Sequence, residues 1–319
     1  MRFNQCRNAL TVAVAAIVTL GGTATTDAQG PVFRSGVDMV PLTVTVTDTS
    51  GKYVTGLTGG DFEVFEDGVQ QSLSFFASDD VPLDVALLLD TSSSMNLDLP
   101  LVKAAAVGLV RKLRANDRAA VVNVKESAGI PQPFTNDRIL IERAIRGLSA
   151  SGETALYDGV YVVLKEFERE RKTAMQVRRQ ALVLLTDGID NRSRLAFEDV
   201  LDFARRVDVN IYIIALRTAL AHVPRAEVDG AVLHADYALN TVTRESGGRL
   251  FFPKAVRDLP EIYTAIAQEL FSQYELGYMP VRSAGDGGFR RVAVRLRPQT
   301  NALARTRTGY YASRARPAL

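Results

Sequence analysis

The hydrophobic and polar positions follow two different periods, which divide the chain into a central region and two flanks. From Pro82 to about Gln273, short apolar runs alternate with longer segments of helical spacing. This alternation is typical of an α/β fold, so we expect a doubly wound, mostly parallel sheet with helices on both faces. The predicted strands are 84–89, 119–124, 181–185, 210–215 and 249–252, and the predicted helices are 99–113, 139–148, 154–171, 197–207, 239–246 and 260–273.

Both flanks show the period of two that half-buried strands have. Leu42–Thr47 alternates apolar with polar residues, Asp67-Gly68 is typical of a hairpin turn, and Arg290–Arg297 alternates again. Because a few short strands cannot bury both of their faces alone, we expect the two flanks to share one small all-β sandwich. The predicted segments are 30–80 and 274–312 for the sandwich, with the α/β domain 82–273 inserted between them.

The first 28 residues resemble a signal peptide. Arg2 and Arg7 precede the apolar run Ala9–Leu20, and small residues follow up to a cleavage site after Ala28. The alternative is an uncleaved N-terminal anchor, although this run is too short to span a bilayer comfortably. We therefore expect an exported protein, which is periplasmic, held at the cell surface or secreted, with no transmembrane segment in the mature chain.

Charge and composition exclude several function classes. The net charge of +2 over 319 residues gives no reason to expect binding to nucleic acid or to an anionic membrane. Cys6 is the single cysteine and lies inside the signal segment, so a disulfide framework or a cysteine nucleophile is excluded. Two histidines, His222 and His234, are too few for a zinc site without cysteines.

Oxygen-bearing side chains cluster after two of the buried strands. Asp90, Ser92 and Ser94 follow the apolar run 85–89, Thr154 follows a glycine turn, and Asp187 follows the run 182–185. Oxygen ligands suit a hard cation such as Mg²⁺, and α/β sheets place ligands at the carboxyl ends of their strands. The alternative for the first loop is a helix N-cap, with Ser92 or Ser94 capping the helix near Leu99.

These three stretches together resemble the von Willebrand factor type A domain with its metal-ion-dependent adhesion site. The matching residues are Asp90-x-Ser92-x-Ser94, Thr154 within 152–156, and Asp187 within Thr186-Asp187-Gly188, and the flanks resemble secreted bacterial relatives. The resemblance implies a bound Mg²⁺, with Mn²⁺ or Ca²⁺ as alternatives. It further implies that Ser92, Ser94 and Thr154 are neutral ligands, and that Asp90 and Asp187 act through water or by hydrogen-bonding the hydroxyls.

In such a site the metal stays under-neutralised, so an Asp or Glu carboxylate of a protein partner completes its coordination. Two hypotheses come from the resemblance. Thr154 coordinates directly only when a partner is engaged, and the last helix, Pro260–Gln273, shifts in response.

Several neighbours of the predicted site have two interpretations. Asp158 either supports the ligands or is an ordinary acid in the first turn of a helix, where the helix dipole favours it. Asp190 either lines the rim or caps the next segment, and Glu153 is expected to point away. Tyr157 and Phe197 are candidates for the rim.

The sequence favours a non-enzymatic, adhesion-type binding module. The alternatives are a metal-assisted hydrolase using Asp90 or Asp187, and a scaffold whose metal is structural. Both histidines fall in the predicted loop Ala219–Ala235, which is longer than a usual connection and is either a recognition element or an unstructured insertion. The oligomeric state stays open.

Overall fold

A computed structural model describes residues 39–78, 81–174, 176–217, 230–281, 286–297 and 301–312. The predicted signal segment, its cleavage site and His222 lie outside these ranges. No helix in the described ranges is both long enough and apolar enough to cross a bilayer.

The central sheet has six strands in the order β10-β9-β8-β5-β6-β7. All neighbouring pairs are parallel except β6 and β7. In chain order the strands are β5 (Leu83–Asp90), β6 (Arg118–Val124), β7 (Ala128–Thr135), β8 (Arg179–Thr186), β9 (Asn210–Ala215) and β10 (Leu250–Phe251). The strand order reverses at β5, which has β6 on one side and β8 on the other, so its carboxyl end is the switch point at which such sheets bind ligands.

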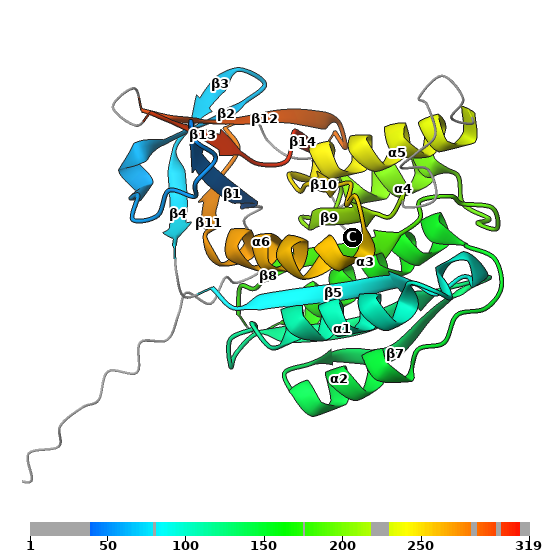
Figure 1. The fold of residues 1–319 in the computed structure, drawn as a ribbon. Coiled ribbons are helices and arrows are strands. Elements are labelled where there is room, and N and C mark those ends of the chain that lie inside the picture. The colour runs from blue at the N-terminus through cyan, green and yellow to red at the C-terminus, as the bar shows by residue number, and fades with distance from the viewer. Residues whose placement is uncertain are drawn as a thin grey trace, which may run out of the picture. The chain divides into compact units, whose positions relative to one another are not determined.

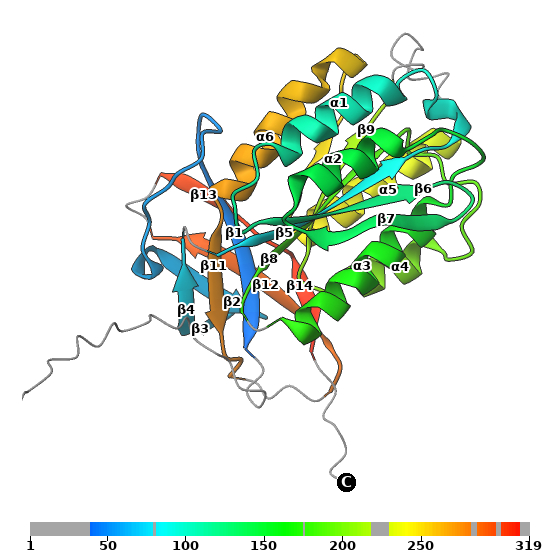
Figure 2. The ribbon, with the colours of Figure 1, turned by 90° about the horizontal axis from the view of Figure 1, so that it is seen from below.

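Helices cover both faces of this sheet (Figure 2). One face carries α1 (Leu99–Val110), α2 (Arg138–Gly147) and α6 (Leu259–Phe271), and the other carries α3 (Leu156–Thr173), α4 (Phe197–Ala204) and α5 (Gly230–Ser246). Side chains along β5 point alternately into the two cores: Leu87 and Leu89 pack with the first set of helices, and Ala86 and Leu88 with the second. The predicted doubly wound α/β fold is confirmed.

The antiparallel edge strand β7 was missed by the sequence analysis. Its sequence contains Pro131 and Pro133, which interrupt any strand pattern. Proline has no backbone N–H to donate. At a sheet edge that position can face solvent, so no hydrogen bond between strands is lost. The pairing of β7 with β6 is irregular, with register shifts on both sides of Val121.

Two four-stranded antiparallel sheets take their strands from both ends of the chain (Figure 1). One has the order β13-β1-β11-β4 and the other β14-β12-β2-β3, and their inner faces share one core. The strands are β1 (Val40–Asp48), β2 (Phe62–Glu66), β3 (Val69–Gln71), β4 (Leu73–Ala77), β11 (Tyr274–Tyr278), β12 (Phe289–Leu296), β13 (Ala302–Arg305) and β14 (Gly309–Tyr311). The prediction that both flanks build one sandwich is confirmed. The domain boundaries 30–80, 82–273 and 274–312 stay a prediction.

The turn between β2 and β3 shows how the sequence determines a local structure. Asp67 and Gly68 both have positive φ, 48° and 82°. A type I′ hairpin turn needs positive φ at both central positions, and an Asp-Gly pair supplies them at low steric cost. The predicted hairpin is confirmed.

The expectation that Leu42–Thr47 is half-buried was wrong. Thr43 and Thr45 on the polar side of β1 are 6% and 2% exposed, because this side faces the α/β region. The Thr43 hydroxyl donates to Glu275 Oε1 at 2.8 Å, and the Thr45 hydroxyl donates to Glu269 Oε1 at 3.5 Å. An alternating pattern therefore marked two buried faces, one apolar and one hydrogen-bonded.

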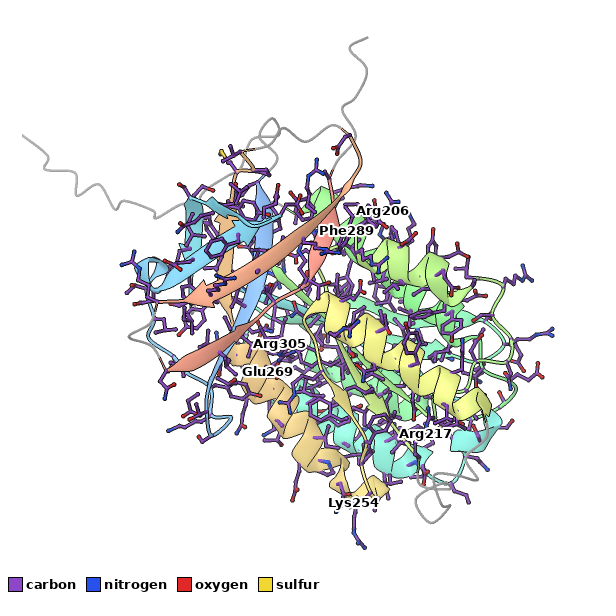
Figure 3. All side chains as sticks on the ribbon, turned by 90° about the horizontal axis from the view of Figure 1, so that it is seen from above. Arg206, Arg217, Lys254, Glu269, Phe289 and Arg305 are labelled. Carbon is purple, nitrogen blue, oxygen red and sulfur yellow. The ribbon has the colours of Figure 1, made fainter. Side chains whose placement is uncertain are left out.

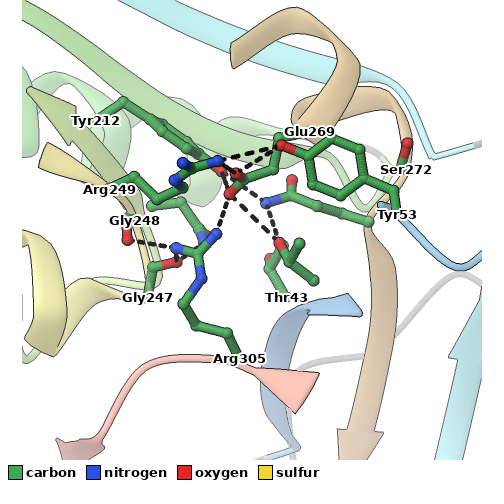
Figure 4. A network of polar contacts seen from close by, with 12 residues as sticks. Thr43, Tyr53, Tyr212, Gly247, Gly248, Arg249, Glu269, Ser272 and Arg305 are labelled. Carbon is green, nitrogen blue, oxygen red and sulfur yellow. Dashed lines mark hydrogen bonds and ion pairs between the residues drawn. The ribbon is translucent and has the colours of Figure 1, made fainter. Parts of the chain in front are cut away.

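Glu269 near the end of α6 is the centre of a polar network at this junction (Figure 4). Its side chain is 1% exposed and accepts hydrogen bonds from the hydroxyls of Tyr212 (2.8 Å) and Tyr53 (3.1 Å). Arg305 of β13 forms an ion pair with the same carboxylate, and Arg249 approaches it at 3.4 Å. The network joins α6 and β9 to the antiparallel strands.

The predicted loop Ala219–Ala235 is shorter than expected. Helix α5 begins at Gly230, so the second part of that segment is helical and His234 lies on the helix. Residues 218–229 lie outside the described ranges. The predicted helix 239–246 covers only the second half of α5. The first half was missed because its exposed residues Leu233, His234 and Tyr237 do not follow a simple amphipathic pattern.

Candidate metal centre

The sheet brings the two predicted carboxylates to neighbouring positions. β5 ends at Asp90 and β8 ends at Thr186, and the two strands are parallel neighbours with Leu89 paired to Leu185. Their carboxyl ends therefore meet at the same edge of the sheet. Arg217, which follows β9, marks this edge in Figure 3, with Lys254 beyond it.

A chain of hydrogen bonds joins Ser92, Ser94 and Asp187. The Ser94 hydroxyl donates to Asp187 Oδ2 at 2.6 Å, and the two serine hydroxyl oxygens are 3.0 Å apart. Because a hydroxyl has a single hydrogen and that of Ser94 is used by Asp187, Ser92 is the donor to Ser94. This arrangement leaves hydroxyl lone pairs available to a cation.

Asp90 is fully buried and holds the loop rather than facing solvent. Its Oδ1 accepts the Ser92 amide at 2.9 Å, and its Oδ2 accepts the Thr186 hydroxyl at 2.8 Å. Burial raises the pKa of Asp90, the hydrogen bonds from Ser92 and Thr186 oppose this, and the negative charge of Asp187 adds to it. A cation in the loop would favour the ionised carboxylate.

The loop carrying Thr154 is bonded to both of the others through its main chain. The Ser93 amide donates to the Gly152 carbonyl at 2.9 Å, and the Ser151 amide donates to the Thr91 carbonyl at 2.9 Å. On the other side, the Thr154 amide donates to Asn191 Oδ1 at 2.9 Å. Thr154 is 3% exposed and precedes α3, which begins at Leu156 rather than at Thr154 as predicted.

Gly152 allows this loop its turn. Its φ of 74° lies in the left-handed region, and a Cβ at this position would collide with the Glu126 carboxylate. The structure thus brings all three loops together. Hydrogen bonds link the side chains of Asp90, Ser92, Ser94 and Asp187 to one another or to adjacent residues, whereas Thr154 is held through its main chain.

The neighbouring acids support the loops. Asp190 Oδ1 accepts the Leu156 amide at 2.8 Å, which caps α3, and it also accepts the Ser193 hydroxyl at 2.7 Å from the segment that follows it. Asp158 accepts the amides of Arg194 and Leu195, which fixes the segment before α4. Glu153 is directed to solvent beside Arg192, with 3.6 Å between the charged atoms.

Asn191 is a supporting residue that the sequence analysis missed. Its side-chain Oδ1 accepts a hydrogen bond from the Thr154 main-chain amide, and its main-chain amide donates to the Thr154 carbonyl at 3.1 Å. The signal was present in the polar run Asp190–Arg194, where Asn191 follows Asp190. The rings of the rim candidates Tyr157 and Phe197 lie 5.9 Å apart at an angle of 51°, and both side chains pack against the core.

The donor set fits a hard cation and does not fit a soft one. In the described part of the chain, no group of three or more His, Cys, Asp or Glu side chains could hold a metal ion. The candidate centre has two carboxylates and three hydroxyls, all oxygen, which suit Mg²⁺, Mn²⁺ or Ca²⁺. The Ser94 hydroxyl hydrogen is directed to Asp187 and that of Ser92 to Ser94, which leaves an oxygen lone pair on each serine for the ion.

The chain belongs to the von Willebrand factor type A domain family. The family model matches residues 84–265, more than half of the chain. The solved structure of a von Willebrand factor type A protein from Catenulispora acidiphila is similar at a TM-score of 0.51 and 13% identity, over 85% of this chain and 73% of that one. This likeness extends beyond the region that the family model matches.

Two further relatives match smaller parts. An uncharacterised Synechocystis protein, sll0103, is 33% identical over 111 residues, which are 34% of this chain and 26% of that protein. The chain thus spans about a quarter of the length of this curated relative. Proximal thread matrix protein 1 from the mussel byssus, solved with zinc in its MIDAS motif, matches at a TM-score of 0.49 and 18% identity, over 66% of this chain and 50% of that one.

Proposed function

We propose that the chain is an exported, metal-dependent protein-interaction module that binds an acidic side chain of a partner. In this proposal Ser92, Ser94 and Thr154 supply oxygen ligands to Mg²⁺, while Asp90 and Asp187 orient the hydroxyls and supply negative charge. The observation that carries the proposal is the hydrogen-bonded series Ser92–Ser94–Asp187 at the switch point of the sheet. Membership of a family of interaction modules supports it.

The chemistry of the donors explains why a partner carboxylate is needed. Mg²⁺ takes six oxygens in near-octahedral geometry, and three neutral hydroxyls compensate little of its charge. Both Asp90 oxygens already accept hydrogen bonds from the protein, so Asp90 contributes charge through Ser92 and not by direct contact. A carboxylate from another molecule completes both the coordination and the charge.

Exposed apolar residues beside the candidate ligands support an interaction surface. Leu97 is three residues after Ser94 and is 90% exposed, and Ile189 is two residues after Asp187 and is 40% exposed. Large apolar side chains exposed around a polar centre are typical of protein-binding sites. In the proposal they contact the partner around its acidic residue.

The export rests on the sequence of residues 1–28, which predicts a periplasmic or cell-surface location.

Metal binding is tested by thermal unfolding with Mg²⁺ or with EDTA, for the wild type and for Asp187→Ala. A ligand that binds only the folded state stabilises by about 2.7 kcal/mol at a hundredfold excess over Kd. We expect Mg²⁺ to raise the Tm of the wild type and of Glu261→Ala, an exposed carboxylate on α6, but not of Asp187→Ala. Equal Mg²⁺ responses in Asp187→Ala and wild type would place the metal elsewhere.

The partner carboxylate needs a separate test. In Mn²⁺-loaded protein, coordinated water speeds the relaxation of bulk water protons, so replacement of that water by a ligand is measurable. We expect acetate to lower this relaxation enhancement and acetamide, its uncharged analogue, to leave it unchanged. The carboxylate part of the proposal fails if the two compounds act alike, even where metal binding itself is established.

A further inference from the structure

A second candidate binding site lies at the opposite end of the central sheet. A groove of about 830 Å³ opens between the C-terminal half of α5 and the antiparallel strands β12 and β13. It includes Gly248 and Arg249, which come just before β10, whereas the metal-centre loops follow the ends of β5 and β8. Figure 3 shows this separation: Arg305 and Glu269 lie at the sandwich end, and Arg217 lies at the far end of the sheet.

Positive charge dominates the lining of this groove. Among the described residues, six arginines line it, and no aspartate or glutamate does. They come from three directions, which are α5, the segment before β10, and the strands β12 and β13 with the segment after β13. The arginines are Arg244, Arg249, Arg291, Arg295, Arg305 and Arg307.

Only part of this charge is compensated. Glu269 pairs with Arg249 and Arg305, and Asp208 lies 3.7 Å from Arg307. Arg244, Arg291 and Arg295 are exposed and have no ion pair within the described ranges. Six arginines less two carboxylates leave an excess of about four positive charges in a concave site, where the field is focused.

Three other carboxylates belong to residues beside the groove, but in the described ranges none of them forms an ion pair with a lining arginine. Glu245 forms an ion pair with Arg205 at 2.5 Å. Asp67 accepts the main-chain amide of Arg291 at 2.9 Å. Glu63 pairs with Arg295 across the β2–β12 ladder without forming an ion pair.

The floor of the groove is preorganised. Arg305 donates to the Gly247 carbonyl at 2.6 Å as well as to Glu269, and Arg307 donates to the Pro41 carbonyl at 2.8 Å. Because these two guanidinium groups donate to the protein itself and Arg307 is buried, they contribute fixed positive charge to the floor, while the exposed Arg244, Arg291 and Arg295 are free to contact a ligand.

We propose that this groove binds an acidic peptide segment of a partner protein. Charge complementarity selects an anion, and arginines arriving from three sides suit carboxylates that project in several directions from an extended chain. A single-stranded nucleic acid needs free aromatic faces on which its bases stack. Phe65 is the aromatic residue among the described lining, and the Arg295 guanidinium covers its ring at 4.9 Å. The inference does not depend on the metal centre.

The test uses fluorescence anisotropy of a labelled oligoglutamate peptide with the full chain. The informative variant is Arg244→Glu/Arg291→Glu, which reverses two exposed charges without breaking a described ion pair. We expect its Kd to be roughly tenfold higher than that of the wild type, because each reversal removes an attraction and adds a repulsion. Binding is expected to weaken with added NaCl.

The matched control is Arg143→Glu/Arg257→Glu, which reverses two exposed arginines on α2 and before α6. A wild-type chain that does not bind the peptide, or equal losses in both double variants, would overturn the proposal. Tighter binding of oligothymidylate than of oligoglutamate would overturn it in favour of nucleic acid. EDTA and Asp187→Ala are expected to leave peptide binding unchanged, which separates this site from the metal centre.

Discussion

Glu269 gives the sharpest test of how the α/β region is held to the antiparallel strands. We propose a double-mutant cycle with Glu269→Gln, Arg305→Gln and the combined variant. Glutamine keeps the approximate size of both side chains and removes their charges, so the cycle isolates the ion pair better than truncation would. The pair joins α6 to β13 across 36 residues of sequence.

The expected magnitude lies between two limits. Removing one partner of a fully buried ion pair costs about 3–5 kcal/mol, whereas an exposed pair contributes about 0.2–1 kcal/mol. Glu269 is 1% exposed, but Arg305 is 34% and Arg249 is 46% exposed, so solvent compensates part of the loss. We expect Glu269→Gln to cost about 2–3 kcal/mol, because two arginines lose their counterion.

Arg305→Gln is expected to cost less, about 1–2 kcal/mol, since Glu269 then keeps Arg249 and the hydroxyls of Tyr212 and Tyr53. The coupling energy between the two positions should be about 1–2 kcal/mol. It is measured by urea denaturation at neutral pH, with unfolding of both regions followed by circular dichroism.

An exposed pair provides the control for this cycle. Arg111 and Glu142 form an ion pair at 2.9 Å with side chains 63% and 21% exposed. The same glutamine cycle there is expected to give a clearly smaller coupling energy, because solvent screens exposed charges. A Glu269–Arg305 coupling no larger than that of this surface pair would refute the reasoning, because burial of Glu269 would then have no energetic consequence.

Three further predictions concern single positions. Burial and the charge of Asp208 raise the pKa of Glu275 to about 8 from its ordinary 4.5, while Arg179 and the Thr43 hydroxyl oppose this. As the pH rises, the unfolded chain therefore loses this proton at a lower pH than the folded chain does. The free energy of unfolding then falls between about pH 4.5 and about pH 8, by up to about 1.4 kcal/mol per pH unit. Glu275→Gln should flatten this dependence in urea titrations at several pH values, and an unchanged slope would contradict the assignment. Asp190→Ala removes the acceptor for the Leu156 amide and should cost about 1 kcal/mol of unfolding free energy, whereas a loss below a few tenths would exclude the cap. Gly152→Ala places an L-residue at φ 74° and should cost about 1–2 kcal/mol by the same assay, whereas no loss would mean that the loop relaxes freely.

The strands of the central sheet could be predicted because burial on both faces leaves an uninterrupted apolar run. The predicted strand Asn210–Ala215 has the same bounds as β9. The predicted strand 84–89 is one residue shorter at each end than β5, which spans Leu83–Asp90. β7 could not be predicted in this way, because Pro131 and Pro133 are compatible only with an edge and the sequence does not reveal which strand will be the edge.

The junction could not be predicted for a different reason. Glu269 lies in α6 among residues that read as an ordinary amphipathic helix, and its partners Tyr53, Tyr212 and Arg305 are far from it in sequence. The polar residues Thr43 and Thr45 of β1 read as solvent-facing for the same reason. A polar residue buried by a long-range contact has the same sequence pattern as an exposed one.

The positions of the candidate ligands were predicted because they follow strands whose ends the sheet brings together. The family resemblance supplied Thr154, which sits in a loop and not after a strand. The supporting contacts of Asp190 and Asn191 depend on how the segment after β8 folds back over the start of α3, and no periodic pattern encodes that path.

Helix α6 connects the two ends of the molecule that carry the candidate sites. Its first turn lies beside α1, with Leu101 and Ala104 of α1 and Pro260 and Tyr263 of α6 lining one pocket between the two helices, and α1 follows the loop of Ser92 and Ser94. Its last turn carries Glu269 into the polar network and continues into β11. The family resemblance led us to hypothesise that α6 shifts on partner binding, and a shift along the helix axis would move Glu269 away from Tyr212 and Arg305. Such a shift would lose the interaction energy that the double-mutant cycle measures, so Glu269→Gln should make the shift easier while it weakens the fold.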